Sequence, residues 1–160
     1  GLRAERGRVR VDPVFSYHGL GADIAGGTPL SVDLVCPTYD TDAAFGEDTM
    51  DFFGSLDAVS DVPVIDPLAV RDGDTLSVDI VHRDATADDR TVTVAVADGF
   101  DPAPEATVTT LAGETMAARN SHEEPAAVVP EEETVAVSDG AVDVTVPTFG
   151  FVRVAFERAE

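Results

Sequence analysis

From residue 29 to the end of the chain, apolar and polar residues alternate with a period of two. This alternation is typical of β-strands that bury one face and expose the other. The alternating segments are also rich in valine and threonine, which favour strands. The pattern predicts half-buried antiparallel strands at residues 29–36, 75–82, 91–98, 106–113, 133–140, 141–147 and 150–157.

Two Asp-Gly dipeptides interrupt the alternation and predict tight turns. They are Asp72-Gly73 and Asp139-Gly140, and an alternating run lies on each side of both. Asp-Gly readily adopts the positive φ of a two-residue hairpin turn, so each dipeptide predicts a hairpin between its flanking runs. Several short strands separated by regular turns favour an all-β fold class, an antiparallel β-sandwich or a jelly-roll-like arrangement.

The first 28 residues follow a helical pattern. Asp12 fits the N-cap position and Pro13 the first helical position, and apolar or small residues then recur at helical spacing until an Ala-Gly-Gly sequence ends the run. The pattern predicts one short helix at about 13–25. Gly19 and Gly21 each weaken an exposed helix by about 1 kcal/mol, so packing must hold it. A lone helix beside a sandwich and a first residue other than methionine favour the end of a larger protein.

The charge is extreme: 160 residues carry a formal net charge of -21, from 31 acidic and 10 basic residues, and every basic residue is arginine. Nucleic acid is an unsuitable partner, because binding to phosphates requires cations. The acids recur between apolar residues instead of forming a tail, which indicates a folded chain. Because molar salt shortens the Debye length to about 3 Å and screens such repulsion, we hypothesise a halophilic source with a salt-filled cytoplasm.

Membrane insertion and cysteine chemistry have little support in the sequence. No apolar run approaches the roughly 20 residues of a membrane-spanning helix, and charges occupy the place of a signal peptide's apolar region. Cys36 is the only cysteine, which excludes an intramolecular disulfide and offers no cysteine-rich metal site. We therefore expect a cytoplasmic protein without a membrane partner, a metal or another cofactor.

The most chemically varied stretch is Ala-Arg-Asn-Ser-His-Glu-Glu-Pro at 118–125. A hydrolytic triad needs its nucleophile and base about 3 Å apart, whereas neighbouring side chains of an extended segment point in different directions. The same geometry disfavours a metal site. We expect a structural loop here and leave a site as the alternative for Asn120, Ser121, His122, Glu123 and Glu124.

Other candidates also have a plain structural interpretation. The acidic stretches 40–48 and 83–90 lack the calcium-loop spacing and are expected to be solvated surface. His18 and His82 are expected in packing or turn positions. An N-terminal group of arginines suits either an anionic partner or interdomain salt bridges: Arg3, Arg6, Arg8 and Arg10.

The segment 39–61 is long for a connection between strands and carries Phe45, Phe52 and Phe53. It is either a ligand or docking loop or an insertion whose phenylalanines enter the core. The sequence therefore singles out no catalytic, cofactor-binding or metal-binding residue.

Several segments together resemble the C-terminal β-sandwich of α-L-arabinofuranosidases of glycoside hydrolase family 51. The residues that carry the resemblance are Leu-Ala-Val-Arg-Asp-Gly-Asp-Thr-Leu at the start of 68–84, the strand 91–96, the motif at 118–130 and the closing run 142–156. Within 118–130, the matching positions are Asn120, Glu123, Pro125, Val128 and Pro130. His122 stands where the family usually has phenylalanine, and Arg119 where it usually has histidine.

The resemblance implies that residues 1–28 are the end of a (β/α)8 catalytic barrel with its last helix, and that 29–160 are the sandwich. It implies that the two catalytic glutamates of the retaining reaction lie in the barrel, and that the parent enzyme removes terminal α-L-arabinofuranosyl groups from arabinose-containing glycans. The family commonly forms oligomers, so we expect a homo-oligomeric parent. The family's sandwich also borrows an N-terminal segment, so one sheet edge is expected to lack its strand.

Two other functions remain open from the sequence. The chain could be a carbohydrate-binding module, although sugar platforms usually use exposed tryptophan and tyrosine, and this chain has no tryptophan and only Tyr17 and Tyr39. It could also be an immunoglobulin-like structural domain of a halophilic surface protein, which would need a secretion route.

Overall fold

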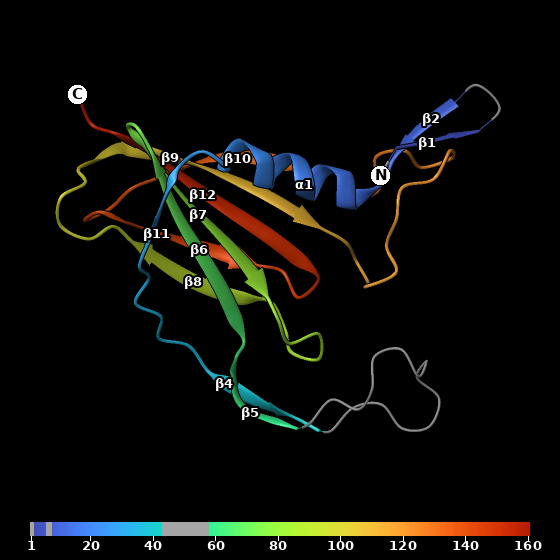
Figure 1. Cartoon of the computed structure of the whole chain (residues 1–160), viewed down its shortest axis with the longest axis horizontal. Helices are drawn as coiled ribbons and strands as arrows, with labels where there is room; N and C mark the ends of the chain where they lie inside the picture. The colour runs from blue at the N-terminus through green and yellow to red at the C-terminus, as the bar shows by residue number, and fades with distance from the viewer. Residues whose placement is uncertain (1, 6–7, 43–57) are drawn as a thin grey trace.

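The computed structural model describes residues 2–5, 8–42 and 58–160. Two antiparallel sheets face each other, and a single described helix lies against one of them (Figure 1). The elements are β1 (Leu2–Glu5), β2 (Arg8–Val11), α1 (Pro13–Asp23), β3 (Thr28–Leu30), β4 (Thr38–Thr41), β5 (Val59–Pro63), β6 (Ile65–Asp72), β7 (Thr75–His82), β8 (Arg90–Ala95), β9 (Pro102–Ala112), β10 (Glu131–Ala136), β11 (Ala141–Val146) and β12 (Gly150–Arg158).

The larger sheet has six strands in the order β10-β9-β12-β7-β6-β3, and the facing sheet consists of β11 and β8. Two further pairs, β1 with β2 and β4 with β5, lie outside these sheets. The predicted fold class is confirmed: the chain is an antiparallel β-sandwich with one short helix. None of the described helical segments has the length and apolarity that crossing a membrane requires.

The main core lies between the two sheets and is built by the inward positions of the alternating strands. Val152, Val154 and Phe156 of β12 are completely buried there, against valines of β11 and β8 such as Val144 and Val94. Burial of each such side chain contributes about 1.5–3 kcal/mol relative to exposure. The period-two pattern therefore correctly identified the inner face of the sandwich.

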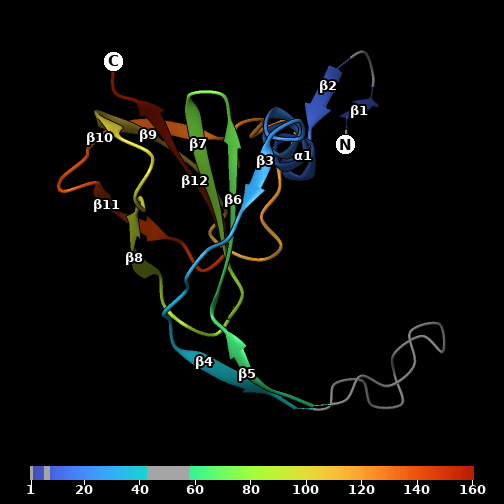
Figure 2. The ribbon, with the colours of Figure 1, turned by 60° about the vertical axis from the view of Figure 1, so that its left-hand side comes forward.

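The outer face of the larger sheet has a second, smaller core under α1. Leu111, Val128 and Phe151 are buried there, and Leu20 of the helix packs against them. The ring of Tyr17 meets the Phe151 ring edge to face, with 5.5 Å between centroids. Figure 2 shows α1 lying beside the sheet next to β3 and β6. The predicted helix is confirmed, and it does have a surface to pack against.

The strands beneath the helix correct one expectation. β7 and β12 were expected to be half-buried, yet each also buries two residues of its outer face, Ser77 and Asp79 in β7 and Phe151 and Arg153 in β12. The inner face packs in the main core, and α1 covers part of the outer face. β10 departs the other way, because nearly all of its residues are exposed at the edge of the sheet.

The two predicted hairpin turns have different outcomes. β6 and β7 pair from Ile65↔His82 to Asp72↔Thr75, so that Gly73, at φ 58°, and Asp74 form the turn. At Asp139-Gly140 both residues have positive φ and the turn forms as predicted. The hairpin does not continue beyond the single bridge Ser138↔Ala141, because β10 pairs with β9 and β11 pairs with β8. This turn carries the chain from one sheet to the other.

The predicted strand at 29–36 is mostly wrong. Only Thr28–Leu30 pairs, with β6 at the sheet edge, and residues 31–37 have no regular secondary structure. Val35 in this stretch is completely exposed. The alternation is present, but no neighbouring strand among the described residues offers its backbone hydrogen bonds.

The long segment 39–61 is bounded by strands. β4 and β5 pair antiparallel, and the Tyr39 hydroxyl at the base donates a hydrogen bond to the Arg83 carbonyl oxygen at 3.1 Å. The pair lies at the end of the molecule away from α1 (Figure 2). Phe45, Phe52 and Phe53, on which the two interpretations of the segment depend, lie outside the described residues.

Candidate functional site on the outer face of the sheet

A buried ion pair occupies the centre of the sheet face beneath α1. Arg153 of β12 stands directly opposite Asp79 of β7 in the strand register. Its Nε donates to Asp79 Oδ1 at 2.6 Å and its Nη2 to Oδ2 at 2.8 Å. The two side chains are only 8% and 10% exposed. Charge-assisted, bidentate pairs of this kind have strong orientational preferences, so Arg153 is held in one position.

The same guanidinium reaches the helix. Nη2 of Arg153 donates to the carbonyl oxygen of Leu20 at 2.7 Å, and Nη1 lies 3.8 Å from a carboxylate oxygen of Asp23. Leu20 is in the last turn of α1, where carbonyl groups lack intrahelical partners and the helix dipole favours a positive charge. Arg153 therefore attaches the C-terminal end of α1 to the sheet.

Sequence reasoning missed this site. Asp79 and Arg153 each occupy a polar position of an alternating strand, and such positions were taken to face solvent. The available signal was one charged residue at the centre of each of two valine-rich strands, negative in one strand and positive in the other. Their pairing depends on β7 and β12 being neighbours, which no local pattern specifies.

The motif at 118–130 is held together by Asn120, which is 1% exposed. Its Nδ2 donates to the carbonyl oxygens of Val11 at 2.8 Å and Val128 at 2.9 Å, and its Oδ1 accepts from the Val128 N–H at 2.7 Å. The amide thereby closes its own loop and ties it to the end of β2. A side chain with all these bonds has a structural role.

The neighbouring polar residues form a turn. The Ser121 Oγ accepts a hydrogen bond from the Glu124 N–H at 2.8 Å, and the Ser121 N–H donates to the Glu124 carbonyl oxygen at 2.9 Å. The Ser121 hydroxyl is thus engaged by the backbone N–H of Glu124, three residues later. His122 is half-buried and Glu123 is exposed.

The acidic loop 83–90 is ordered by its own carboxylates. Asp84 Oδ1 accepts from the Thr86 hydroxyl at 2.7 Å and from the Thr86 N–H at 2.9 Å. Both bonds lower the pKa of Asp84 because they favour the ionised carboxylate, and the bond from the hydroxyl has the larger effect. Within the described part of the chain, no three metal-ligating side chains converge. Most of the other acidic stretch, 43–48, lies outside the described residues.

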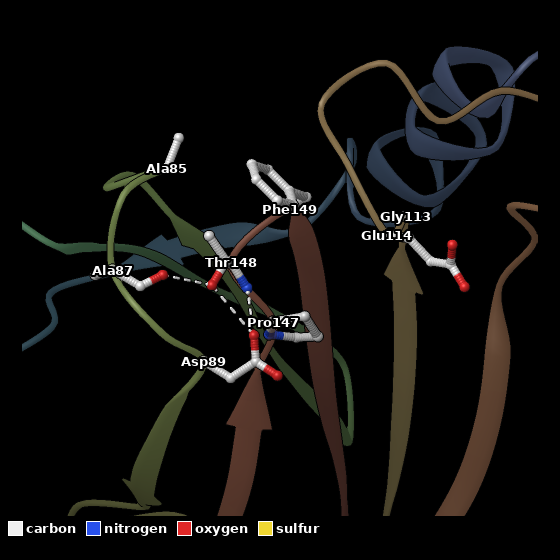
Figure 3. Close-up of a pocket in the computed structure, with 8 residues that line it drawn as sticks. All are labelled: Ala85, Ala87, Asp89, Gly113, Glu114, Pro147, Thr148 and Phe149. Carbon is white, nitrogen blue, oxygen red and sulfur yellow. Dashed lines mark hydrogen bonds between the residues drawn. The ribbon is translucent and has the colours of Figure 1, made fainter.

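A hollow of about 350 Å³ lies at the end of the sandwich where this loop meets residues 113–114 and 147–149. Asp89 Oδ1 accepts from the Thr148 N–H at 2.9 Å, and the Thr148 hydroxyl lies 2.7 Å from the Ala87 carbonyl oxygen. Figure 3 shows Glu114, the other carboxylate, pointing away from Asp89. The polar groups of the hollow therefore join loops, and its two carboxylates do not face each other as a catalytic carboxylate pair would.

The remaining candidates lie apart. His82 is buried at the end of β7, and its Nε2 lies 3.2 Å from the Asp88 carbonyl oxygen, which fits the expected turn role. His18 is exposed on α1. Arg3 and Arg10 are opposite one another in the β1–β2 pair, whereas Arg6 lies outside the described residues.

Comparison with known proteins agrees with the fold. The model of the α-L-arabinofuranosidase C-terminal domain family matches residues 2–149. No curated protein matches the chain at a significant level.

Solved arabinofuranosidases share the fold over nearly the whole chain. The GH51 α-L-arabinofuranosidase of Thermotoga petrophila RKU-1 superposes with a TM-score of 0.78 at 24% identity, covering 98% of this chain and 31% of that one. The Thermotoga maritima enzyme, solved as an arabinose complex, gives 0.79 at 25% identity with the same coverage. The Xanthomonas axonopodis pv. citri GH51 enzyme gives 0.74 at 21%, covering 98% and 28%.

This chain thus spans about a third or less of the length of each of these relatives. The family model, in contrast, extends over nearly all of it, from β1 to the turn before β12. The chain belongs to the family of α-L-arabinofuranosidase C-terminal domains.

Proposed function

We propose that the chain is the non-catalytic C-terminal β-sandwich of an α-L-arabinofuranosidase that hydrolyses terminal α-L-arabinofuranosyl groups of arabinose-containing oligosaccharides and polysaccharides. In the homologous GH51 enzymes this domain is attached to a catalytic barrel domain. The two catalytic glutamates of the retaining reaction would belong to that barrel. The sandwich would support the barrel and the homo-oligomer.

The observation that carries this proposal is the attachment of α1 to the sheet. We propose that residues 1–28 are the end of the barrel and its connection to the sandwich at 29–160. The Arg153 bond to the Leu20 carbonyl oxygen joins these two parts, and the bond to Asp79 fixes Arg153 on the sandwich side. A segment leaving the barrel would in this way be held rigidly against the supporting domain.

The facing sheet supports a second part of the proposal. Among the described residues β8 and β11 pair only with each other, so each has one edge without a partner. Open edges accept further strands. We propose that a strand from the N-terminal part of the parent enzyme completes this sheet.

Activity measurements test the assignment of catalysis. The purified chain 1–160 and a longer product of the same gene are incubated with nitrophenyl α-L-arabinofuranoside. We expect nitrophenol release from the longer product only. Release by the chain 1–160 that stays proportional to its concentration through successive purification steps would place the catalytic groups within it.

We further propose a halophilic source and a salt-filled cytoplasm, supported by the dispersed charge of -21. Urea unfolding in about 0.1 M and about 3 M potassium chloride tests this, because that range spans strong and weak repulsion between charges. Stability should rise with salt, and less so in E131Q/E133Q, which removes two exposed charges from β10. Equal stability at both concentrations would contradict the proposal.

A further inference from the structure

A hollow of about 360 Å³ lies on the outer face of the larger sheet, beside the C-terminal end of α1. Its floor is Ala155 of β12, which pairs with Ser77 of β7 on one side and Thr107 of β9 on the other. The next residues of β12 on this face are the long side chains of Arg153 and Glu157. The methyl group of Ala155, between them, is too short to fill the space above the sheet.

The walls have mixed chemistry. Leu20 and Ile24 at the end of α1 and Val70 of β6 provide an aliphatic side. Three carboxylates stand around the rim, from Asp23, Asp72 and Glu132. The volume lies in the range of about 300–1,000 Å³ that is usual for small-molecule sites.

Two buried hydroxyls face this hollow. Ser77 is 8% and Thr109 is 5% exposed, and both line the cavity. Among the described residues neither hydroxyl has a hydrogen-bond partner, and both residues line the hollow. Buried hydroxyls normally have partners, so these two are available to a molecule in the hollow.

The charges define which molecule fits. Arg153 is the cation of the hollow, and its Nε and Nη2 are engaged by Asp79 and Leu20. The carboxylates would repel an anion, and they do not converge on one point as cation ligands would. The groups present suit a neutral molecule with many hydroxyls and an aliphatic C–H face.

We propose that this hollow binds one or two neutral sugar units of a glycan. The hydroxyls of Ser77 and Thr109 exchange hydrogen bonds with sugar hydroxyls, the rim carboxylates accept further ones, and the Leu20 and Val70 side chains contact the sugar's C–H face. This binding function is separate from hydrolysis and does not depend on the barrel. It also needs no aromatic platform, which the sequence argument had required of a carbohydrate-binding module.

Titration of the isotopically labelled chain 1–160, followed through its amide NMR signals, tests the proposal. The probes are arabinobiose and xylobiose, with inorganic phosphate and spermidine as anionic and cationic controls. We expect either disaccharide to shift the Ser77, Thr109 and Ala155 amides with millimolar affinity. Absence of shifts at saturating millimolar sugar, or stronger shifts with phosphate or spermidine, would overturn the proposal.

Variants locate the binding. Thr109→Val removes one hydroxyl at constant shape and should weaken sugar binding about fivefold, the equivalent of one hydrogen bond. Ala155→Leu should fill the hollow and abolish binding. Thr134→Val, on the exposed part of β10 and outside the hollow, is the matched control and should bind as the native chain does. Unchanged affinity in both T109V and A155L would refute the site, whatever the outcome of the hydrolysis assay.

Discussion

Arg153 and Asp79 face each other on β12 and β7, and both carboxylate oxygens accept hydrogen bonds from one guanidinium. Removing one partner leaves the other charge buried without compensation. Asp79→Ala should therefore lower the free energy of unfolding by about 3–5 kcal/mol, measured by urea denaturation. Asp74→Ala, which breaks the exposed pair with Arg158, is the control and should cost under about 1 kcal/mol.

Replacing both members of the pair should loosen the attachment of α1 while the sheet stays folded. Well-packed apolar residues often substitute for a buried ion pair without loss of stability, so R153M/D79L should keep the sandwich folded. The Leu20 carbonyl would nevertheless lose its donor. We expect amide hydrogen exchange to speed up in α1 and to stay slow in β7 and β12. Equal acceleration in helix and strands would show that Arg153 has no separate role in attaching the helix.

Asn120→Ala should be among the most destabilising changes outside the main core. It leaves the Val128 N–H and the Val11 and Val128 carbonyl oxygens without their amide partners. Unsatisfied buried groups cost about 1–3 kcal/mol each, and we expect a total loss of about 3 kcal/mol in thermal or urea unfolding. Glu123→Ala, at an exposed position of the same loop, should change stability by under about 0.5 kcal/mol.

Gly140→Ala tests the turn that carries the chain between the sheets. Gly140 has φ 74°, a conformation that a β-carbon disfavours by about 1–2 kcal/mol. We expect a loss of that size in the free energy of unfolding. Gly26→Ala is the matched control, because a β-carbon there meets no atom within 4 Å and its φ lies outside the left-handed region. A similar loss in both variants would exclude backbone strain as the cause.

The carboxyl of Asp84 should titrate below its ordinary pKa, because the Thr86 hydroxyl and N–H stabilise its ionised form. A lowered folded-state pKa means that this contribution to stability is present above the unfolded-state pKa and is lost as pH falls through the folded-state value. Thr86→Val should raise the pKa of Asp84, followed by carboxyl-carbon NMR. Thr91→Val, an exposed substitution on β8, should leave it unchanged; an equal rise in both would show that the lowered pKa does not depend on the Thr86 hydroxyl.

The strands could be predicted because each needs only its own alternation, as in residues 75–82 and 150–157, which became β7 and β12. The same alternation misled at 29–36, where the pattern is present and the pairing partner is missing beyond Leu30. The Asp139-Gly140 turn likewise forms from local backbone preference. Its flanking strands then pair elsewhere, because each has a longer ladder available, β10 with β9 and β11 with β8.

Of the sites, local patterns could identify Asn120 as part of a family motif but not its bonds to Val11, which is 109 positions away. The hollow beside α1 could not be predicted at all. It exists because Ala155, Ser77 and Thr107 come from three strands that the topology places side by side.

The sequence by itself determined the inner face of the sandwich, the helix at the N-terminus and the turns, because these depend on periodicity and on residues with restricted φ. The tertiary structure alone decided which polar positions became buried. Arg153 and Leu20 are 133 positions apart, and their contact forms only when α1 closes over β12. Charges at such positions look like solvent-facing residues until the fold supplies both the counter-charge and the cover.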